Sequence, residues 1–193
     1  SECPDIFPLS DQDGNRKWVL MGASDKYLVG SFQNGKFMAE QPVLSLHYGD
    51  SGYAGQTFSN LPNGRVIRVV WDIWAMATHN FKGQMGIPME LSLIKHNETY
   101  YIHSNPIQEI ESIYNHTKNF DNITLNAQTA FHESLDIGPH ILKIKGGHYT
   151  KGNLRITVFG KPILLDFSKN EITITHTAPI SLTHTDLDLT IIV

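Results

Sequence analysis

Histidine, cysteine and glutamate are the residue types in this chain with the clearest chemical potential. Ten histidines are present among 193 residues, and a zinc site would need three or four such ligands to converge. No two histidines have the His-Glu-x-x-His spacing of a zinc enzyme. The single cysteine, Cys3, excludes an intrachain disulfide and a cysteine-based zinc cluster. We therefore expect no metal site and no cofactor, and we interpret the histidines as surface or structural residues.

The opening segment becomes informative when it is combined with three later stretches. It reads Ser1-Glu2-Cys3-Pro4-Asp5-Ile6-Phe7-Pro8-Leu9. A lone glutamate near a terminus is usually solvated. The later stretches are Leu46-His47-Tyr48-Gly49-Asp50 leading into Tyr53-Ala54-Gly55-Gln56-Thr57-Phe58, then Arg65-Val66-Ile67-Arg68-Val69-Val70-Trp71, and finally Met85-Gly86-Ile87-Pro88-Met89-Glu90-Leu91-Ser92-Leu93.

In this order and spacing, the four stretches resemble glycoside hydrolase family 32. Its members are invertases, levanases and inulinases that act on β-fructofuranosides. The family has a Glu-Cys-Pro motif, an Asp-Tyr-Gly and Tyr-Ala-x-Gln-Thr-Phe stretch, an apolar strand that ends in Gly-Trp, and a Pro-Arg-Glu-Leu segment. The resemblance implies an all-β chain: the C-terminal blades of a five-bladed β-propeller over residues 1–104, then a β-sandwich within residues 105–193.

The resemblance also implies roles for individual residues. Glu2 matches the family's acid/base glutamate, and Cys3 and Pro4 complete its motif. Trp71 matches the tryptophan that lines the sugar pocket, and Glu90 is expected to support the site. Three further substrate-binding candidates lie in the second stretch: His47, Asp50 and Tyr53.

The implied reaction releases fructose from a fructose-containing oligosaccharide or polysaccharide such as sucrose, levan or inulin. A retaining glycosidase needs a nucleophilic carboxylate and an acid/base about 5 to 5.5 Å apart. The family's nucleophile lies in an Asn-Asp-Pro-Asn motif and a further aspartate in an Arg-Asp-Pro motif, and this chain contains neither. We therefore expect the chain alone to be inactive. It would need the N-terminal half of the propeller or would self-associate through open strand edges.

Three departures from the family's pattern favour a second interpretation. His47 stands where the family has Asp, Val70 replaces the glycine before Trp71, and Met89 replaces the arginine before Glu90. A catalytically dead, carbohydrate-binding relic of the same fold would tolerate such changes. An intact nucleophile motif in the upstream coding sequence would favour the enzyme.

The elements that must position these residues are strands. Short apolar runs occupy residues 17–21, 27–32, 53–58, 66–71, 90–94, 99–103, 140–145, 154–159, 171–175 and 187–193. Asn34-Gly35 predicts a hairpin, because type I′ turns need a positive φ at both central positions. A second pair, Asn63-Gly64, is expected to join residues 53–58 to 66–71. This spacing predicts antiparallel sheets in a propeller, barrel or sandwich.

One helix is predicted between the two strand-rich regions. Asn105 can cap it, and Pro106 fits the first helical position. Ile107, Ile110 and Ile113 then repeat at helical spacing. We expect this helix to connect the two domains.

Charge and hydropathy limit the partners. The net charge is −4 and the sequence pI is about 6.2, which argues against a nucleic-acid partner because phosphates attract clustered Lys and Arg. The longest apolar runs are far shorter than the roughly 18 residues that span a bilayer, so we expect no membrane partner. Val193 lies inside a predicted strand, so the C-terminus is expected to be truncated. The resemblance slightly favours an extracellular or periplasmic location over a cytoplasmic one.

Overall fold

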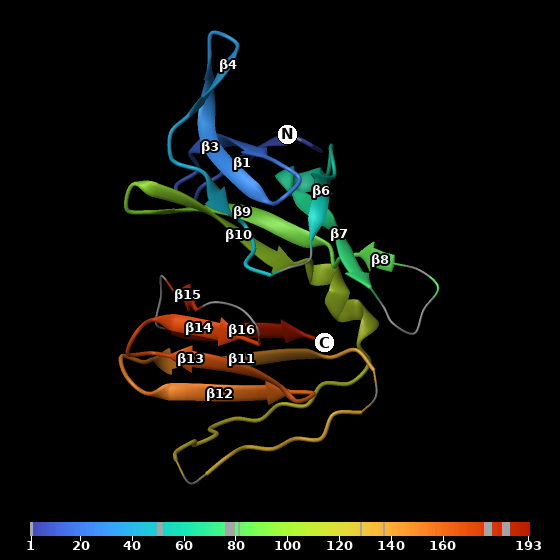
Figure 1. Ribbon diagram of the computed structural model, residues 1–193, viewed down its shortest axis with the longest axis vertical. Coiled ribbons are helices and arrows are strands. Elements are labelled where there is room, and N and C mark those ends of the chain that lie inside the picture. Colours follow the sequence, from blue (N-terminus) through green and yellow to red (C-terminus); the bar gives the residue numbers. More distant parts are fainter. Residues whose placement is uncertain are drawn as a thin grey trace. The chain divides into compact units, whose positions relative to one another are not determined.

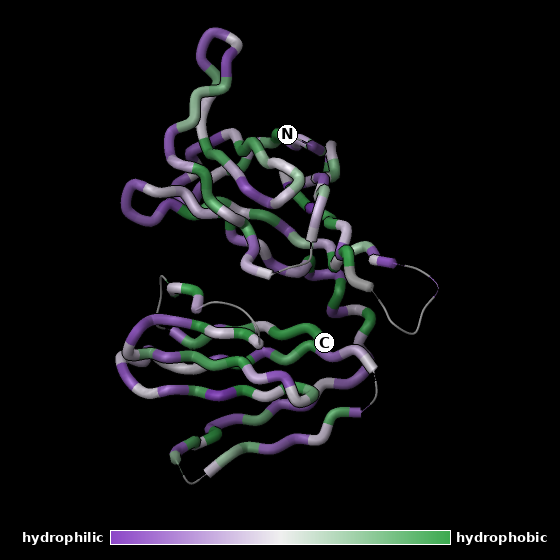
Figure 2. Tube along the Cα trace, viewed as in Figure 1, coloured by the Kyte–Doolittle hydropathy of each residue, from purple (hydrophilic) through white to green (hydrophobic). Residues whose placement is uncertain are grey.

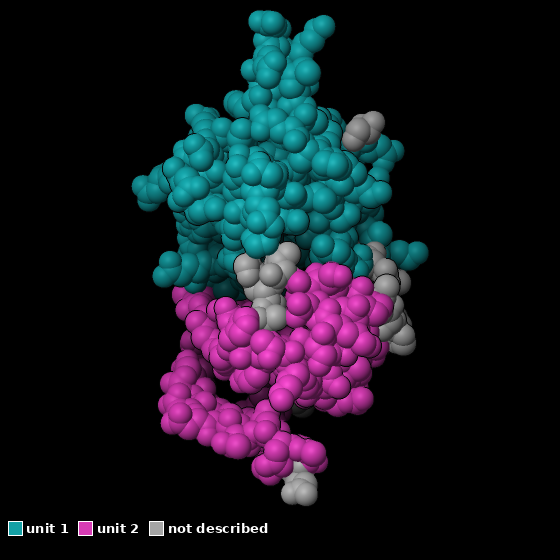
Figure 3. Space-filling model, turned by 90° about the vertical axis from the view of Figure 1, so that its left-hand side faces the viewer, with its two compact units in different colours: residues 1–110 teal, residues 111–193 magenta. Residues whose placement is uncertain are grey.

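Two compact units make up the chain, and strands are the main regular secondary structure of both. The computed structural model describes residues 2–49, 52–75, 80, 82–127, 129–136, 138–175, 179–182 and 186–193. The units are residues 1–110 and residues 111–193 (Figure 3). Within the described residues, the only helical segments are two short 3-10 helices, η1 (Pro62–Gly64) and η2 (Gln108–Ile113). The predicted all-β class is therefore confirmed.

The first sheet of unit 1 is an antiparallel meander (Figure 1). Its strands are β1 (Asp5–Ser10), β2 (Arg16–Met21), β3 (Lys26–Gln33) and β4 (Lys36–Ala39), with β5 (Leu44–Ser45) paired to β3. Asn34 and Gly35 connect β3 to β4 with φ angles of 49° and 76°. Because both angles are positive, as in a type I′ turn, the predicted hairpin is confirmed.

The second sheet of unit 1 has the strand order β10-β9-β7-β6, with β8 paired to β7. Its strands are β6 (Tyr53–Thr57), β7 (Ile67–Ala75), β8 (Lys82–Met85), β9 (Met89–His96) and β10 (Thr99–Pro106). Asn63 and Gly64 lie between β6 and β7, as predicted, and both have positive φ angles. They belong to η1, however, so the connection is longer than a two-residue turn.

One hydrophobic core joins the two sheets of unit 1. Its buried side chains come from β1, β2 and β3 and from β9 and β10: Phe7, Leu9, Val19, Met21, Tyr27, Val29, Leu91, Leu93 and Tyr100. Two glutamines add polar ties between loops of the first sheet and strands of the second. The Gln12 amide donates to the Lys95 carbonyl and accepts from the Lys95 N–H, both at 2.9 Å. Gln41 makes the same two bonds to Tyr100, both at 2.8 Å.

Unit 2 contains a two-stranded and a four-stranded sheet. The first pairs β11 (Ile141–His148) with β16 (Asp186–Ile192); the second has the order β12 (Asn153–Val158), β13 (Lys161–Asp166), β14 (Glu171–Ile174) and β15 (Ile180–Ser181). Both sheets contribute to one apolar cluster around Ile163, Leu165, Phe167 and Leu187. Hydrophobic residues follow the strands of both units, and hydrophilic residues gather at hairpin turns such as β3–β4 (Figure 2). The description of these units as propeller blades and a β-sandwich stays a prediction.

The predicted helix at residues 105–114 is wrong in type and in its start. Asn105 and Pro106 are the last residues of β10 and pair with β9. The helical segment that follows is the 3-10 helix η2, and Ile113 at its end is 63% exposed. The isoleucine spacing therefore does not reflect a buried helical face. In the described part of the chain, no helix has the length and apolarity needed to cross a membrane.

Candidate active site

The backbone of the Glu2 segment is held by two separate parts of unit 1. The N–H of Ala23, in the turn between β2 and β3, donates to the Glu2 carbonyl at 3.1 Å. The side-chain amide of Gln56, on β6, donates to the Cys3 carbonyl at 3.2 Å. Cys3 itself has a positive φ of 43°. These contacts place the glutamate although it is the second residue of the chain.

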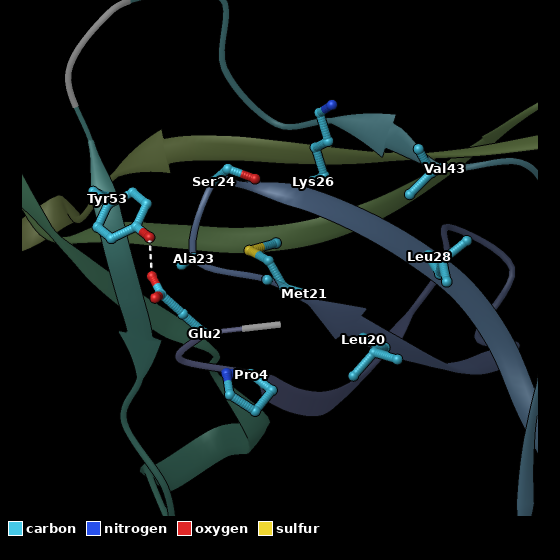
Figure 4. Close-up of a pocket in the computed structure, with 11 residues that line it drawn as sticks. Glu2, Pro4, Leu20, Met21, Ala23, Ser24, Lys26, Leu28, Val43 and Tyr53 are labelled. Carbon is cyan, nitrogen blue, oxygen red and sulfur yellow. Dashed lines mark hydrogen bonds between the residues drawn. The ribbon is translucent and has the colours of Figure 1, made fainter.

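The Glu2 carboxylate and the Tyr53 hydroxyl meet at the start of β6. The tyrosine O–H donates a hydrogen bond to the carboxylate (Figure 4). This hydrogen bond is the main reason why the pKa of Tyr53 is raised above its usual value of 10, and desolvation and the negative charge of Glu2 add to it. The phenol therefore remains a proton donor to the carboxylate at neutral pH.

A cleft of about 530 Å³ opens beside this pair (Figure 4). Its lining residues are Glu2, Pro4, Leu20, Met21, Gly22, Ala23, Ser24, Lys26, Leu28, Val43 and Tyr53. The cleft combines an apolar wall from β2 and β3 with a few polar side chains, and its volume lies in the range of about 300 to 1,000 Å³ typical of small-molecule sites. It could admit a sugar-sized ligand next to a carboxylate.

Trp71 lies beside Tyr53 on the neighbouring strand. The two residues are directly opposite in the antiparallel pairing of β6 with β7, so their side chains share a face of the sheet. The Trp71 side chain is 47% exposed. Trp71 is not among the residues that line the cleft, so its predicted role in lining the sugar pocket stays a prediction.

Among the remaining predicted site residues that the structure describes, only Pro4 lines the cleft. His47 contacts Asp25, with 2.9 Å between its Nδ1 and the aspartate Oδ2, and it does not line the cleft. Asp50 lies outside the described residues. Pro4 lines the cleft, and Cys3 is an exposed free thiol. The Glu90 carboxylate accepts a hydrogen bond of 2.8 Å from Arg65, and Glu90 does not line the cleft.

Sequence reasoning missed three residues that shape this region: Asp25, Gln56 and Arg68. Gln56 belongs to one of the quoted motifs and could have been included with Tyr53. Arg68 had a signal too, because it is an arginine inside a run of valine and isoleucine, and it is 3% exposed. Asp25 had none, since an aspartate in a turn is ordinary. The described residues contain no group of three or more metal-ligating side chains that could hold an ion.

Comparisons with known proteins agree with the resemblance noted in the sequence. The model of the glycosyl hydrolases family 32 N-terminal domain matches residues 1–106. The chain is 33% identical over 132 residues to a levanase of Bacillus sp. (strain L7), covering 58% of this chain and 14% of that protein. It is 32% identical over 135 residues to a levanbiose-producing levanase of Bacillus subtilis (strain 168), covering 58% of this chain and 26% of that protein. The chain thus spans about a quarter or less of the length of these two relatives.

Two solved structures resemble the fold. Exo-inulinase from Aspergillus awamori superimposes with a TM-score of 0.63 at 15% identity, over 100% of this chain and 47% of that one. A family 32 β-fructofuranosidase from Bombyx mori gives a TM-score of 0.58 at 15% identity, over 98% of this chain and 44% of that one. At this identity the likeness concerns the fold alone.

Proposed function

The chain belongs to glycoside hydrolase family 32, and from that membership we propose that it forms part of an enzyme that releases fructose from β-D-fructofuranosides. The substrates would be of the sucrose, levan or inulin type. The reaction would follow the retaining two-carboxylate mechanism, with Glu2 as the acid/base. The levanases that the chain resembles support this class of substrate.

The observation that carries the proposal is the position of the Glu2 carboxylate. It lies at a ligand-sized cleft, hydrogen-bonded to Tyr53, in a segment whose backbone is tied to both sheets of unit 1. An acid/base has to reach the leaving oxygen of the substrate from a fixed position, because proton transfer requires hydrogen-bond distance. The tyrosine gives the carboxylate one fixed partner and leaves its other lone pairs for the substrate.

In the proposed mechanism Glu2 acts twice. First it donates its proton to the glycosidic oxygen while the nucleophilic carboxylate attacks the anomeric carbon, which breaks the bond to the leaving group. Then the Glu2 carboxylate takes a proton from the water that hydrolyses the covalent intermediate. We assign the nucleophile to none of the residues of this chain, because the chain contains no Asn-Asp-Pro-Asn motif.

A second candidate function is a sugar-binding module without catalysis. Met89 favours it, since an apolar side chain stands at the start of β9 where the family has arginine. Glu90, the next residue, engages Arg65. A relic of this kind would retain affinity for levan or inulin and release no fructose.

The experiment that separates the two candidates is Glu2→Gln in the full-length protein that contains this chain. Glutamine keeps the shape of the side chain but cannot donate the acid's proton. We expect fructose release from sucrose and levan to fall by a factor of about 10² to 10⁴, with binding of levan retained. The matched control is Glu98→Gln, at a turn where the side chain is 96% exposed, and it should leave turnover unchanged. Full activity of Glu2→Gln would exclude Glu2 as the acid/base, and an inactive parent that still binds levan would support the relic.

A further inference from the structure

Two charged side chains are buried together beneath the Tyr53 segment. Arg68 is 3% exposed and Asp25 is 2% exposed. The Arg68 Nη1 donates to the Asp25 Oδ2 at 3.0 Å, and its Nη2 donates to Oδ1. His47 adds a third contact at 2.9 Å through Nδ1. Because a carboxylate only accepts, Nδ1 carries the proton in this contact. We call Asp25, Arg68 and His47 the buried cluster.

Stability alone is a poor explanation for this cluster. Removing two charges from water is expensive, and an apolar pair of similar volume often serves a fold as well or better. In addition, the Arg68 Nε is buried and has no hydrogen-bond partner among the described residues. The distinctive property of such a cluster is therefore its geometry: a planar guanidinium and a carboxylate fix each other's orientation by two parallel hydrogen bonds.

One end of the cluster fixes the turn between β2 and β3. Asp25 has a left-handed φ of 57°, and its N–H donates to the Gly22 carbonyl at 3.1 Å. Within this turn, the Ala23 N–H donates to the Glu2 carbonyl at 3.1 Å. The Ala23 carbonyl accepts from the Ala54 N–H at 2.9 Å. The turn therefore connects the backbone of Glu2 directly to that of the residue after Tyr53.

The other end of the cluster supports an irregularity in β6. Pairing with β7 shifts register between Tyr53 and Gln56, and Ala54 has a positive φ of 52°. Such a bulge changes the direction in which the neighbouring side chains point. The Arg68 guanidinium lies directly against Gly55, where any Cβ would overlap with it. The bulge that sets the direction of the Tyr53 side chain is thus packed against the Arg68 guanidinium.

From this geometry we infer that the buried cluster is a positioning device, which sets the Glu2 carboxylate and the Tyr53 hydroxyl at hydrogen-bond distance from two different segments. Asp25 acts through the turn at Ala23, and Arg68 acts through the bulge at Gly55. His47 holds the second oxygen of Asp25 from the segment that precedes β6. The importance of this device for catalysis rests on the proposed function of Glu2. The positioning of Glu2 and Tyr53 by the buried cluster does not depend on that proposal.

The contact can be measured in the 193-residue chain without any turnover. Tyrosine labelled with ¹³C at Cζ reports the ionisation of each phenol by NMR, and Tyr53→Phe assigns the signal. Glu2→Gln defines the Tyr53 pKa when the carboxylate is lost. The test variant is Asp25→Asn/Arg68→Gln, which removes both buried charges together and leaves neither uncompensated. The control is Lys17→Met/Glu40→Gln, which removes an ion pair of the same unit with 2.6 Å between Nζ and Oε2.

We expect the test variant to lower the Tyr53 pKa to the level of Glu2→Gln, and the control pair to leave it unchanged. In the full-length protein the test variant should lower kcat about 10- to 100-fold, as for a misplaced catalytic group, with KM for sucrose unchanged. An unchanged Tyr53 pKa in a folded test variant would overturn the inference. If the double variant does not fold, the single variant Arg68→Lys replaces it. Lysine keeps the positive charge but loses the two parallel hydrogen bonds of the guanidinium, so it should also lower the Tyr53 pKa. Full activity of Glu2→Gln combined with a lowered Tyr53 pKa in the test variant would refute the proposed function and leave the positioning device standing.

Discussion

The Tyr53 hydroxyl gives the Glu2 carboxylate a fixed partner, and phenylalanine at this position would not. A tyrosine can donate to an ionised carboxylate and accept from a protonated one. It can therefore hold Glu2 in both protonation states that an acid/base passes through. The raised pKa of Tyr53 keeps the phenol protonated throughout the neutral range.

We predict that Tyr53→Phe in the full-length protein lowers kcat for fructose release roughly fivefold and leaves KM nearly unchanged. The size follows from the net value of one hydrogen bond, about 1 kcal/mol, converted to a rate. Steady-state assays with sucrose and levan measure it. Tyr101→Phe, a half-exposed tyrosine on β10, is the control. Equal effects of the two substitutions would contradict a specific role for Tyr53.

The sequence motifs point to the residues with a proposed chemical role, but they do not point to the residues that hold those side chains in place. Glu2 and Tyr53 belong to motifs, and the structure brings them together. Asp25 and Arg68 are 43 residues apart, and nothing in their local sequences connects them. Such a pair is created by the packing of one sheet on the other, so only coordinates reveal it.

At the scale of elements, the segment η2 is tied to the second sheet by charge. Arg65 donates to both carboxylate oxygens of Glu109, at 2.6 and 3.0 Å, and to Glu90 at 2.8 Å. Arg65 lowers the pKa of the Glu109 carboxyl from 4.5 to about 2. One guanidinium thus connects the loop before β7, the start of β9 and η2.

This tie should depend on pH in a definite direction. Because folding depresses the pKa of Glu109, the stabilisation is present above pH 4.5 and is lost as the pH falls towards 2. We predict that ¹³C NMR of the carboxyl groups finds Glu109 titrating near 2. Arg65→Met should return its pKa towards 4.5. A Glu109 that titrates near 4.5 in the unaltered chain would show that the pair does not persist in solution.

The same segment shows what periodicity could not predict. Isoleucines at positions 107, 110 and 113 match a helix, but Pro106 still pairs in β10 and Ile113 is exposed. Apolar residues at helical spacing favour a helix only weakly over so short a segment. Strand pairing in β10 and ion pairs such as that of Glu109 can therefore determine its structure instead. Strands, by contrast, were predictable because alternation and Asn-Gly turns specify them locally.

At the scale of the whole molecule, the described site lies entirely within unit 1. Its cleft, its carboxylate and the buried cluster all fall in residues 2–68. The retaining mechanism requires a second carboxylate in the role of nucleophile. The proposed reaction therefore needs a nucleophilic carboxylate, and we assign that role to none of these 193 residues.

We predict that the purified 193-residue chain releases no fructose from sucrose or levan above the level of its own Glu2→Gln variant. Without the nucleophile the covalent step cannot occur. Addition of a polypeptide that carries the family's Asn-Asp-Pro-Asn motif should restore turnover. Turnover by the chain alone at the rate of the full-length protein would show that one of its own carboxylates serves as nucleophile.

The two glutamines that tie the loops of the first sheet to the second also affect how the protein meets other copies of itself. β10 lies at one edge of its sheet, and an open edge is a template for intermolecular strand addition. At Tyr100, however, the Gln41 side-chain amide already binds both the backbone carbonyl and the backbone N–H, as a neighbouring strand would. A foreign strand would have to displace this side chain before it could add to the edge. Gln41 therefore opposes strand addition at this one position, and the Tyr100 amide should exchange its hydrogen with solvent slowly although it lies on an edge.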